Sequence, residues 1–358
     1  PARRPGTSVM RKRLMTIVSA LVALAVLVTA VVVILQARGD DDTDRTRLAG
    51  ALAMAPEDSV RFSWTDWTAV RREVGLDLDA ASPATAVEDL LERGFEEDLT
   101  STTALGSSAV VMQERLGFSP ATLDWELFSQ GPTVATLTMR AGPDLDYDFV
   151  ASRLREAGYE EPDAVTGPWV ANPVEDQITS VVSPELTIIS LDEDAGMLYA
   201  SDTLTGALAA MRSGADEATE ALPREVVTAV AEPLSASLAT GDQACSALAM
   251  ARADVTDEEE GKALVAAAGD VNPLTGFSIG VVPGGAVQVV MGFESEERAR
   301  TNAETRAVLA TGPAPGQGGD FSERFALERV SVTGQAVVFD LAPEPGAYVV
   351  SDLSSGPV

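Results

Sequence analysis

An uninterrupted apolar run at residues 14–35 constrains this chain more than any other feature. It reads LMTIVSALVALAVLVTAVVVIL and holds no charge, no proline and no glycine. A helix of that length spans about 33 Å at about 1.5 Å per residue, and the hydrocarbon core of a bilayer is about 30 Å thick. We therefore predict a transmembrane helix from Leu14 to Leu35.

The charges beside this run predict its orientation. The segment 1–13 has no acidic residue and five basic ones, Arg3, Arg4, Arg11, Lys12 and Arg13. Positive flanking charge keeps a segment in the cytoplasm, so we predict a cytoplasmic stub and an extracytoplasmic body. A secretory signal has a shorter apolar region, about 7–15 residues, and a small-residue cleavage site that is missing here. The predicted location is thus the cell membrane, with a single-pass signal anchor. Met10 is a natural start, so residues 1–9 are either upstream translation or a cytosolic tail.

The body that follows is strongly acidic. The chain has 25 Lys and Arg against 55 Asp and Glu, a net charge of −30, and five of the basic residues precede the apolar run. Such a surface repels nucleic acid and anionic lipid headgroups, which excludes both as partners of the body. It attracts cations or basic proteins, although solubility is the commoner reason for an acidic surface. We interpret the segment 36–55, with its acids Asp40, Asp41, Asp42 and Asp44, as a solvated linker.

Residues 56–358 show the mixed periodicities of an α+β body. Apolar residues alternate at 133–139 and 287–293, which predicts strands, and helical spacing follows at 147–157. A polar, alanine-rich stretch before Pro223 predicts a joint between two related modules, 56–222 and 223–358. Each module is expected to hold its own antiparallel sheet. The same patterns predict helices at 83–94 and 104–116, strands at 178–182 and 244–251, and a hairpin at Pro283-Gly284-Gly285.

Two segments spaced by 150 residues predict a repeated β-α-β-β unit. Ser201-Asp202 precedes Thr205-Gly206, and Ser351-Asp352 precedes Ser355-Gly356. Ser and Asp are preferred N-cap residues, so each pair is expected to cap the next helix; a repeated ligand site on this turn is the alternative. The second unit stops where its last helix should begin, which predicts that the protein continues past Val358.

The composition excludes the common nucleophilic and zinc enzymes. Histidine is absent, and Cys245 is the sole cysteine, so neither a serine or cysteine nucleophile with a histidine base nor a zinc site can be assembled. Ser278 fits G-x-S-x-G but falls within an alternating strand, where a nucleophile elbow cannot form. Lys262 lacks the S-x-x-K spacing of a serine–lysine dyad. We interpret Cys245 as a buried small residue or as the partner of a residue beyond Val358.

Carboxylates are the remaining candidates for chemistry. Asp144, Asp146 and Asp148 give D-x-D-x-D, but Phe149 and Arg155 replace the glycine and glutamate that an EF-hand needs. We interpret these acids, and those of 257–261, as helix-start residues. A paired-carboxylate hydrolase stays open, although no pair stands out. The sequence therefore predicts no catalytic residue and no cofactor, and it leaves the question of a metal undecided.

Three stretches resemble a group of uncharacterised bacterial secreted or membrane-anchored proteins. They are APEDSVRFSW at 55–64, LGFSPATLDW at 116–125, and the strand–turn–strand–helix at 186–212. The resemblance implies an extracytoplasmic α+β protein and carries no catalytic residues. The function predicted is a non-enzymatic binding or scaffold domain of the cell envelope, bound to an envelope protein or a cation. The alternative is a carboxylate-dependent hydrolase acting on envelope polysaccharide.

Overall fold

The computed structural model describes residues 46–164, 167–172, 178–215, 222–248 and 254–355. The predicted stub, the predicted transmembrane helix and the acids of 40–44 lie outside these ranges. Within the ranges, no helix is both long enough and apolar enough to cross a membrane. The chain divides into two compact units at residues 47 and 48, and the description below concerns the second, Leu48–Val358. The described residues of this unit bury an extensive hydrophobic core, so we treat it as an independently folding body.

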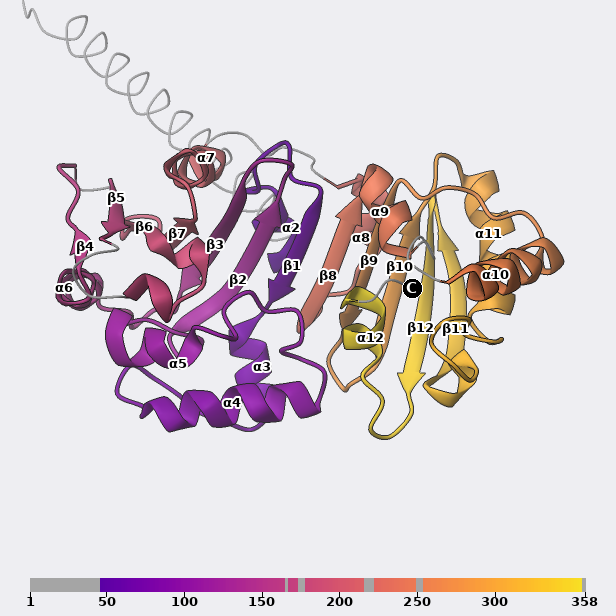
Figure 1. Cartoon of the computed structure of the whole chain (residues 1–358), viewed down its shortest axis with the longest axis horizontal. Helices are drawn as coiled ribbons and strands as arrows, with labels where there is room; N and C mark the ends of the chain where they lie inside the picture. Colours follow the sequence, from indigo (N-terminus) through magenta and orange to yellow (C-terminus); the bar gives the residue numbers. More distant parts are fainter. Residues whose placement is uncertain (1–45, 165–166, 173–177, 216–221, 249–253, 356–358) are drawn as a thin grey trace, which may run out of the picture. The chain divides into compact units, whose positions relative to one another are not determined.

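The second unit is built on one large antiparallel sheet (Figure 1). The strands are β1 Arg61–Thr65, β2 Leu123–Gln130, β3 Ala135–Ala141, β4 Tyr159–Glu160, β5 Pro168–Ala171, β6 Ile188–Asp192, β7 Met197–Ser201, β8 Ser235–Thr240, β9 Gly276–Val281, β10 Val287–Gly292, β11 Phe325–Thr333 and β12 Ala336–Pro343. In the described residues their order is β11-β12-β10-β9-β8-β1-β2-β3-β7-β6-β5-β4. Every residue of β7 and β9 is buried, so neither strand shows the alternation of a half-exposed sheet.

Helices cover both faces of this sheet. They are α2 Arg47–Leu52, α3 Trp67–Glu73, α4 Ala84–Glu96, α5 Ala109–Val111, α6 Tyr147–Glu156, α7 Leu204–Ala215, α8 Arg224–Ala229, α9 Gly241–Leu248, α10 Val255–Ala268, α11 Glu296–Leu309 and α12 Val349–Ser355. Buried residues of α2, α7 and α8 pack in one cluster with Trp64 and Leu127. Those of α3, α4, α6, α11 and α12 pack in another with Leu123 and Leu137. The fold is thus a mixed α+β sandwich of three layers.

The two halves of the sheet have the same strand order. The first half runs β1-β2-β3-β7-β6, and the second runs β8-β9-β10-β12-β11. The central strands β1 and β8 pair antiparallel, and Ser63 lies opposite Ser237 at the middle of the pair. This register is what a local twofold axis through the two serines would give. The prediction of a separate sheet for each module is wrong, because the β1–β8 ladder joins both halves into one sheet.

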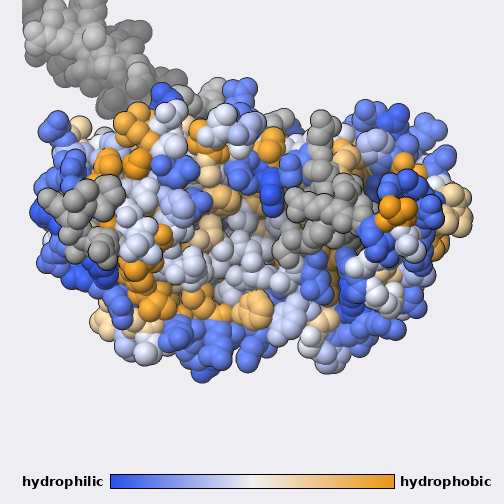
Figure 2. Space-filling model, in the orientation of Figure 1, coloured by the Kyte–Doolittle hydropathy of each residue, from blue (hydrophilic) through white to orange (hydrophobic). Residues whose placement is uncertain are grey.

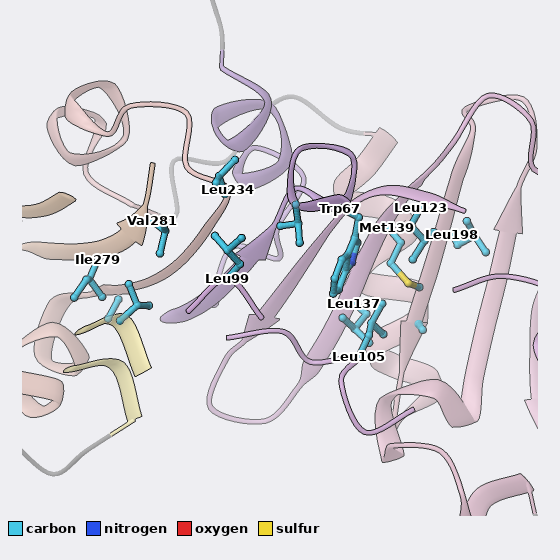
Figure 3. Close-up of a cluster of buried hydrophobic side chains, with 14 of the residues drawn as sticks. Trp67, Leu99, Leu105, Leu123, Leu137, Met139, Leu198, Leu234, Ile279 and Val281 are labelled. Carbon is cyan, nitrogen blue, oxygen red and sulfur yellow. The ribbon is translucent and has the colours of Figure 1, made fainter. Parts of the chain in front are cut away.

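One hydrophobic cluster also continues across this junction. Figure 3 shows Trp67, Leu99 and Leu137 from the first half of the chain, with Leu234 and Ile279 from the second. Residues of both halves are therefore removed from water together. The folded body also begins inside the predicted linker, because Leu48 and Leu52 of α2 are buried.

Several local predictions fail for identifiable reasons. The stretch predicted as a strand at 178–182 contains a short 3₁₀ helix at Ile178–Ser180. In the stretch predicted as a strand at 244–251, the described residues belong to α9. Both are short apolar runs, for which periodicity cannot distinguish a strand from a helix. Gly94 lies inside α4 and does not end it. The helix predicted at 104–116 is reduced to α5 and one π-helical turn, which ends at Gly117 in the left-handed conformation.

The predicted Ser-Asp capping pairs fail as well. Thr203 caps α7, since its Oγ1 accepts the backbone N–H of Gly206 at 3.1 Å. Ser351 and Asp352 lie inside α12, not ahead of it. The repeat therefore shows in the topology of the sheet, whereas the spacing of 150 residues aligns positions that are not equivalent.

Candidate functional site

A pocket of about 400 Å³ opens beside α10 and α11 in the second half of the body. Apolar side chains make most of its wall. They come from α10, from the segment leading into β9, from α11 and from the loop after it: Leu264, Leu274, Leu309, Pro315 and Phe321. This size lies at the lower end of the range for small-molecule sites, about 300–1,000 Å³. Of the two pockets described in this part of the molecule, this one has the more apolar lining. Figure 2 shows a mixed surface on the face it presents, with hydrophilic and apolar side chains interspersed.

Local capping fixes the two helices that form the pocket. The side chain of Asp254 accepts the backbone N–H groups of Thr256 at 2.8 Å and Asp257 at 3.0 Å, so Asp254 is the N-cap of α10. The hydroxyl of Ser295 accepts the N–H of Arg298 at 3.2 Å and caps the start of α11. Each helix start is therefore a short-range property of the sequence.

Arg306 is the one charged residue in the described lining. Its Nε donates to Asn302 Oδ1 at 3.2 Å, and its Nη2 donates to the carbonyl of Asn272 at 2.9 Å. The guanidinium also lies 5.7 Å from the ring centre of Phe293, a cation–π distance. Burial lowers the pKa of Arg306 below its usual value, and the nearby Cys245 opposes this shift. Among the described residues, the groups that hold this charge in place are neutral.

Cys245 reaches the same pocket from α9. It is half-buried and not in a disulfide, and its thiol donates weakly to the carbonyl of Leu274 at 3.7 Å. The helix turns this thiol toward the core cluster that also contains Leu274. Cys245 therefore packs as a small apolar residue, one of the two roles that the sequence left open.

A second, polar hollow adjoins the pocket. Pro313 and Pro315 belong to both walls. The second hollow is lined by Asp257 and Glu260 of α10 and by the glycine-rich loop of 313–319. Acidic side chains thus stand beside an apolar pocket that contains none in its described lining.

Glu126 is a fully buried acid in the other half of the body. Its carboxylate accepts hydrogen bonds from Trp67 Nε1 at 3.0 Å, from Thr103 Oγ1 at 2.6 Å and from the backbone N–H of Ala104 at 3.0 Å. Burial raises its pKa to about 7, and these hydrogen bonds oppose the rise. These partners are all groups of the surrounding core, so we assign Glu126 a structural role.

Buried hydroxyls form a third polar cluster, beneath α7. Thr138 of β3 and Ser190 of β6 both lie opposite Tyr199 of β7, so the three side chains share one face of the sheet. The hydroxyls of Thr138 and Ser190 have no hydrogen-bond partner among the described residues. The face under α7 is thus polar and incompletely satisfied, and buried hydroxyls without a described partner also occur on other strands, such as Thr65 of β1 and Ser235 of β8.

The motifs taken from the sequence occupy structural positions. Asp146 caps α6 by accepting the N–H of Phe149 at 2.9 Å, as predicted. Ser278 is buried within β9, and Lys262 forms an exposed ion pair with Glu258 at 2.6 Å. Within the ranges that the structure describes, no group of three Cys, Asp or Glu side chains could hold a metal ion.

Comparison with known proteins leaves the assignment to the site itself. No protein-family model and no curated protein matches this chain. A solved structure described as "Structure of crystal form I of TP0453" is 7% identical, covers 84% of this chain and 95% of that chain, and has a TM-score of 0.38. That score is too low to carry an argument.

Sequence reasoning missed the pocket and Arg306. An arginine in a helix with Glu304 two residues before it reads as a solvated surface residue. One sequence feature could have indicated the role of Arg306. Asn302 precedes it by one helical turn, a spacing at which the amide oxygen can accept a hydrogen bond from the guanidinium. The segment 271–274 completes the wall of the pocket. It is separated from α11 in the sequence, so periodicity could not predict that the two are in contact.

Proposed function

We propose that this protein is a single-pass membrane protein whose extracytoplasmic body is a non-enzymatic binding domain of the cell envelope. The pocket beside α10 and α11 is the place where it binds. The observation that carries this proposal is the character of the described lining, which is mostly apolar and includes one half-buried guanidinium. Such a wall favours retention of a ligand, because apolar contact supplies affinity and a single polar group orients the bound molecule.

The buried acids do not favour the alternative of a carboxylate-dependent hydrolase. Glycoside hydrolysis needs two carboxylates that face each other across a substrate cleft. Glu126 is enclosed by Trp67, Thr103 and Ala104, and Asp98 is bonded to backbone groups of α12. Neither acid contributes to the wall of the pocket.

The membrane anchor is tested with the full chain in a bacterial host. We expect the protein to stay with membranes after alkaline carbonate washing, and protease added to spheroplasts to digest the body. A variant that reverses the charge of Arg11, Lys12 and Arg13 is the control, because it removes the orientation signal. A body that wild-type spheroplasts protect from protease, or that is released into the medium, would contradict the anchor.

The binding role is tested with a neutral apolar fluorophore, 1-aminoanthracene, and the body 46–358. We expect saturable binding to the wild type and its loss in Leu264→Trp, whose indole fills the pocket. Ala263→Trp is the matched control, because it places the same side chain on an exposed position of the same helix. Equal binding by both variants would remove the pocket as the site.

A further inference from the structure

The pocket beside α10 and α11 combines an apolar wall with one unopposed positive charge. Its described lining holds Arg306 and no acidic side chain, in a chain with a net charge of −30. In so acidic a protein an arginine has many possible partners. No carboxylate pairs with Arg306 within the described residues, although exposed arginines of the same helix do form such pairs, as Arg300 does with Glu296.

The hydrogen bonds of Arg306 leave donors for a ligand. A guanidinium carries five N–H donors. Two of its nitrogens donate to Asn302 and to the carbonyl of Asn272, and no other hydrogen bond of this side chain is found in the described part of the chain. Both acceptors are neutral, so they fix the orientation of the group without neutralising it. A half-buried charge in an apolar wall is costly until an anion pairs with it.

We infer that the pocket binds an amphiphile with a single apolar chain and an anionic head group that pairs with Arg306. This inference rests on the binding role proposed above and names the class of ligand. Leu264, Leu274 and Leu309 provide apolar contact for the chain, while the guanidinium provides paired donors for two oxygens of a carboxylate or phosphate. The volume of about 400 Å³ suits one short chain better than a two-chain lipid.

The acids beside the pocket shape this selectivity. Asp257 and Glu260 line the adjoining hollow and repel an anionic head there. Charges separated by more than about 8 Å are largely screened at physiological ionic strength, so the wider acidic surface weakens binding little. An anionic head group at Arg306 therefore pairs with the guanidinium and avoids the hollow lined by Asp257 and Glu260.

The test compares four probes that share one decyl chain: decanoate, decyl phosphate, decan-1-ol and decyltrimethylammonium. Binding to the body 46–358 is measured by calorimetry below the micellar concentration of each probe. We expect at least one anion to bind about tenfold or more tightly than decan-1-ol, since hydrogen bonds to a charged group are the strong ones. Preference for decanoate identifies a fatty acid as the ligand class, and preference for decyl phosphate identifies a phosphate monoester.

Variants assign the preference to Arg306. Arg306→Met is expected to bind decan-1-ol as the wild type does and to lose the advantage of the anions. Arg300→Met, on an exposed position of the same helix, makes the same change in net charge and is expected to keep that advantage. Circular dichroism and thermal unfolding check that both variants fold. Arg306→Lys keeps the positive charge but lacks the planar guanidinium, so its preference for anions is expected to lie between those of Arg306→Met and Arg300→Met.

Three results would overturn the inference, and they differ in whether the proposed binding role also fails. Equal binding of the anions and decan-1-ol by the wild type, or an anion preference that survives in Arg306→Met, removes the ligand class but leaves a binding pocket. Absence of binding by every decyl probe, together with absence of 1-aminoanthracene binding, removes the binding role as well.

Discussion

The carboxylate of Asp98 accepts the backbone N–H of Val350 at 2.6 Å across 252 residues of sequence. It also accepts the N–H of Ser351 at 3.1 Å, so an acid that follows α4 caps the first turn of α12. Phe95 and Tyr348 stack beside it, with ring centres 5.2 Å apart. Asp98 has a φ of 57°, a left-handed conformation in a residue other than glycine. One side chain thus ties the first half of the body to its last described helix.

Substitution of Asp98 separates the cap from the backbone strain. Asp98→Ala loses the cap and keeps a Cβ in the left-handed region, so we expect it to lose about 1 kcal/mol in the free energy of unfolding relative to wild type. Asp98→Gly loses the same cap but relieves about 1–2 kcal/mol of backbone strain, which offsets the loss. Urea unfolding of the body 46–358 should therefore rank Asp98→Gly above Asp98→Ala. Equal stability of the two variants would show that strain at this position is negligible.

Two helical glycines should respond to alanine in opposite directions. A Cβ on Gly94 in α4 would lie 2.4 Å from Thr100 Cγ2, whereas one on Gly50 in α2 meets nothing within 4 Å. We expect Gly50→Ala to raise the free energy of unfolding by about 0.5–1 kcal/mol, from helix propensity. We expect Gly94→Ala to lower it by about 1–3 kcal/mol, from overpacking.

The cause of the Gly94 effect can be checked by a second substitution. Thr100→Ser removes Cγ2 and keeps the hydroxyl that donates to the carbonyl of Leu91 at 3.1 Å. It should recover most of the stability lost in Gly94→Ala, as measured by urea unfolding. A double variant as unstable as Gly94→Ala alone would mean that the clash is not the cause.

Glu126 should make stability depend on pH in the acid range. Its pKa is about 7 in the folded state against an ordinary 4.5, so between these values the folded protein keeps a proton that the unfolded chain releases. Stability contributed by this group is therefore present at low pH and lost as pH rises through the window, by about 3 kcal/mol in total. Glu126→Gln cannot titrate. The difference in unfolding free energy between wild type and Glu126→Gln should thus shrink from pH 4 to pH 8.

The measurement decides whether the stability difference between wild type and Glu126→Gln falls or rises with pH. A difference that grows with rising pH would mean that the three hydrogen bonds outweigh burial and that the folded pKa lies below the ordinary value. Other acids titrate in the same range in both proteins, so only the difference between the two curves is interpreted.

Removal of a buried hydroxyl should stabilise the folded protein where the hydroxyl has no hydrogen-bond partner and destabilise it where it has one. Thr138 has an unpartnered hydroxyl among the described residues, so Thr138→Val should raise the free energy of unfolding by about 1 kcal/mol. The hydroxyl of Thr103 donates to Glu126 at 2.6 Å, so Thr103→Val should lower it by about 1–3 kcal/mol. Thermal and urea unfolding compare the two. A loss of stability in Thr138→Val would indicate an ordered water at that hydroxyl.

Cys245 reports on the pocket without any engineering, because it is the single cysteine of the chain. Its thiol is half-buried, so we expect slow reaction with a disulfide reagent in the folded body and fast reaction in urea. A saturating decyl ligand should slow the folded reaction severalfold, and Leu264→Trp should abolish this protection. Unchanged reactivity with bound ligand would place the ligand away from Cys245.

Local chemistry accounts for the elements that the sequence predicted well. The side chain of Asp146 caps α6, and the run of Gly284 and Gly285 turns between β9 and β10 with both residues at positive φ. These features depend on neighbours within a few residues, which the sequence displays directly. The failures at 178–182 and 244–251 are short apolar runs whose form depends on what packs against them.

The sequence by itself determined an acidic α+β body, its excluded catalytic classes and the starts of α4 and α6, because composition and capping are read from the residues themselves. It also predicts the membrane anchor at residues 14–35, which lies outside the described structure. Only the tertiary structure decided that both halves share one sheet, that Asp98 caps α12, and that Arg306 meets Asn272 in an apolar wall. Those contacts join residues far apart in the chain, and no local pattern encodes which distant surfaces are removed from water together.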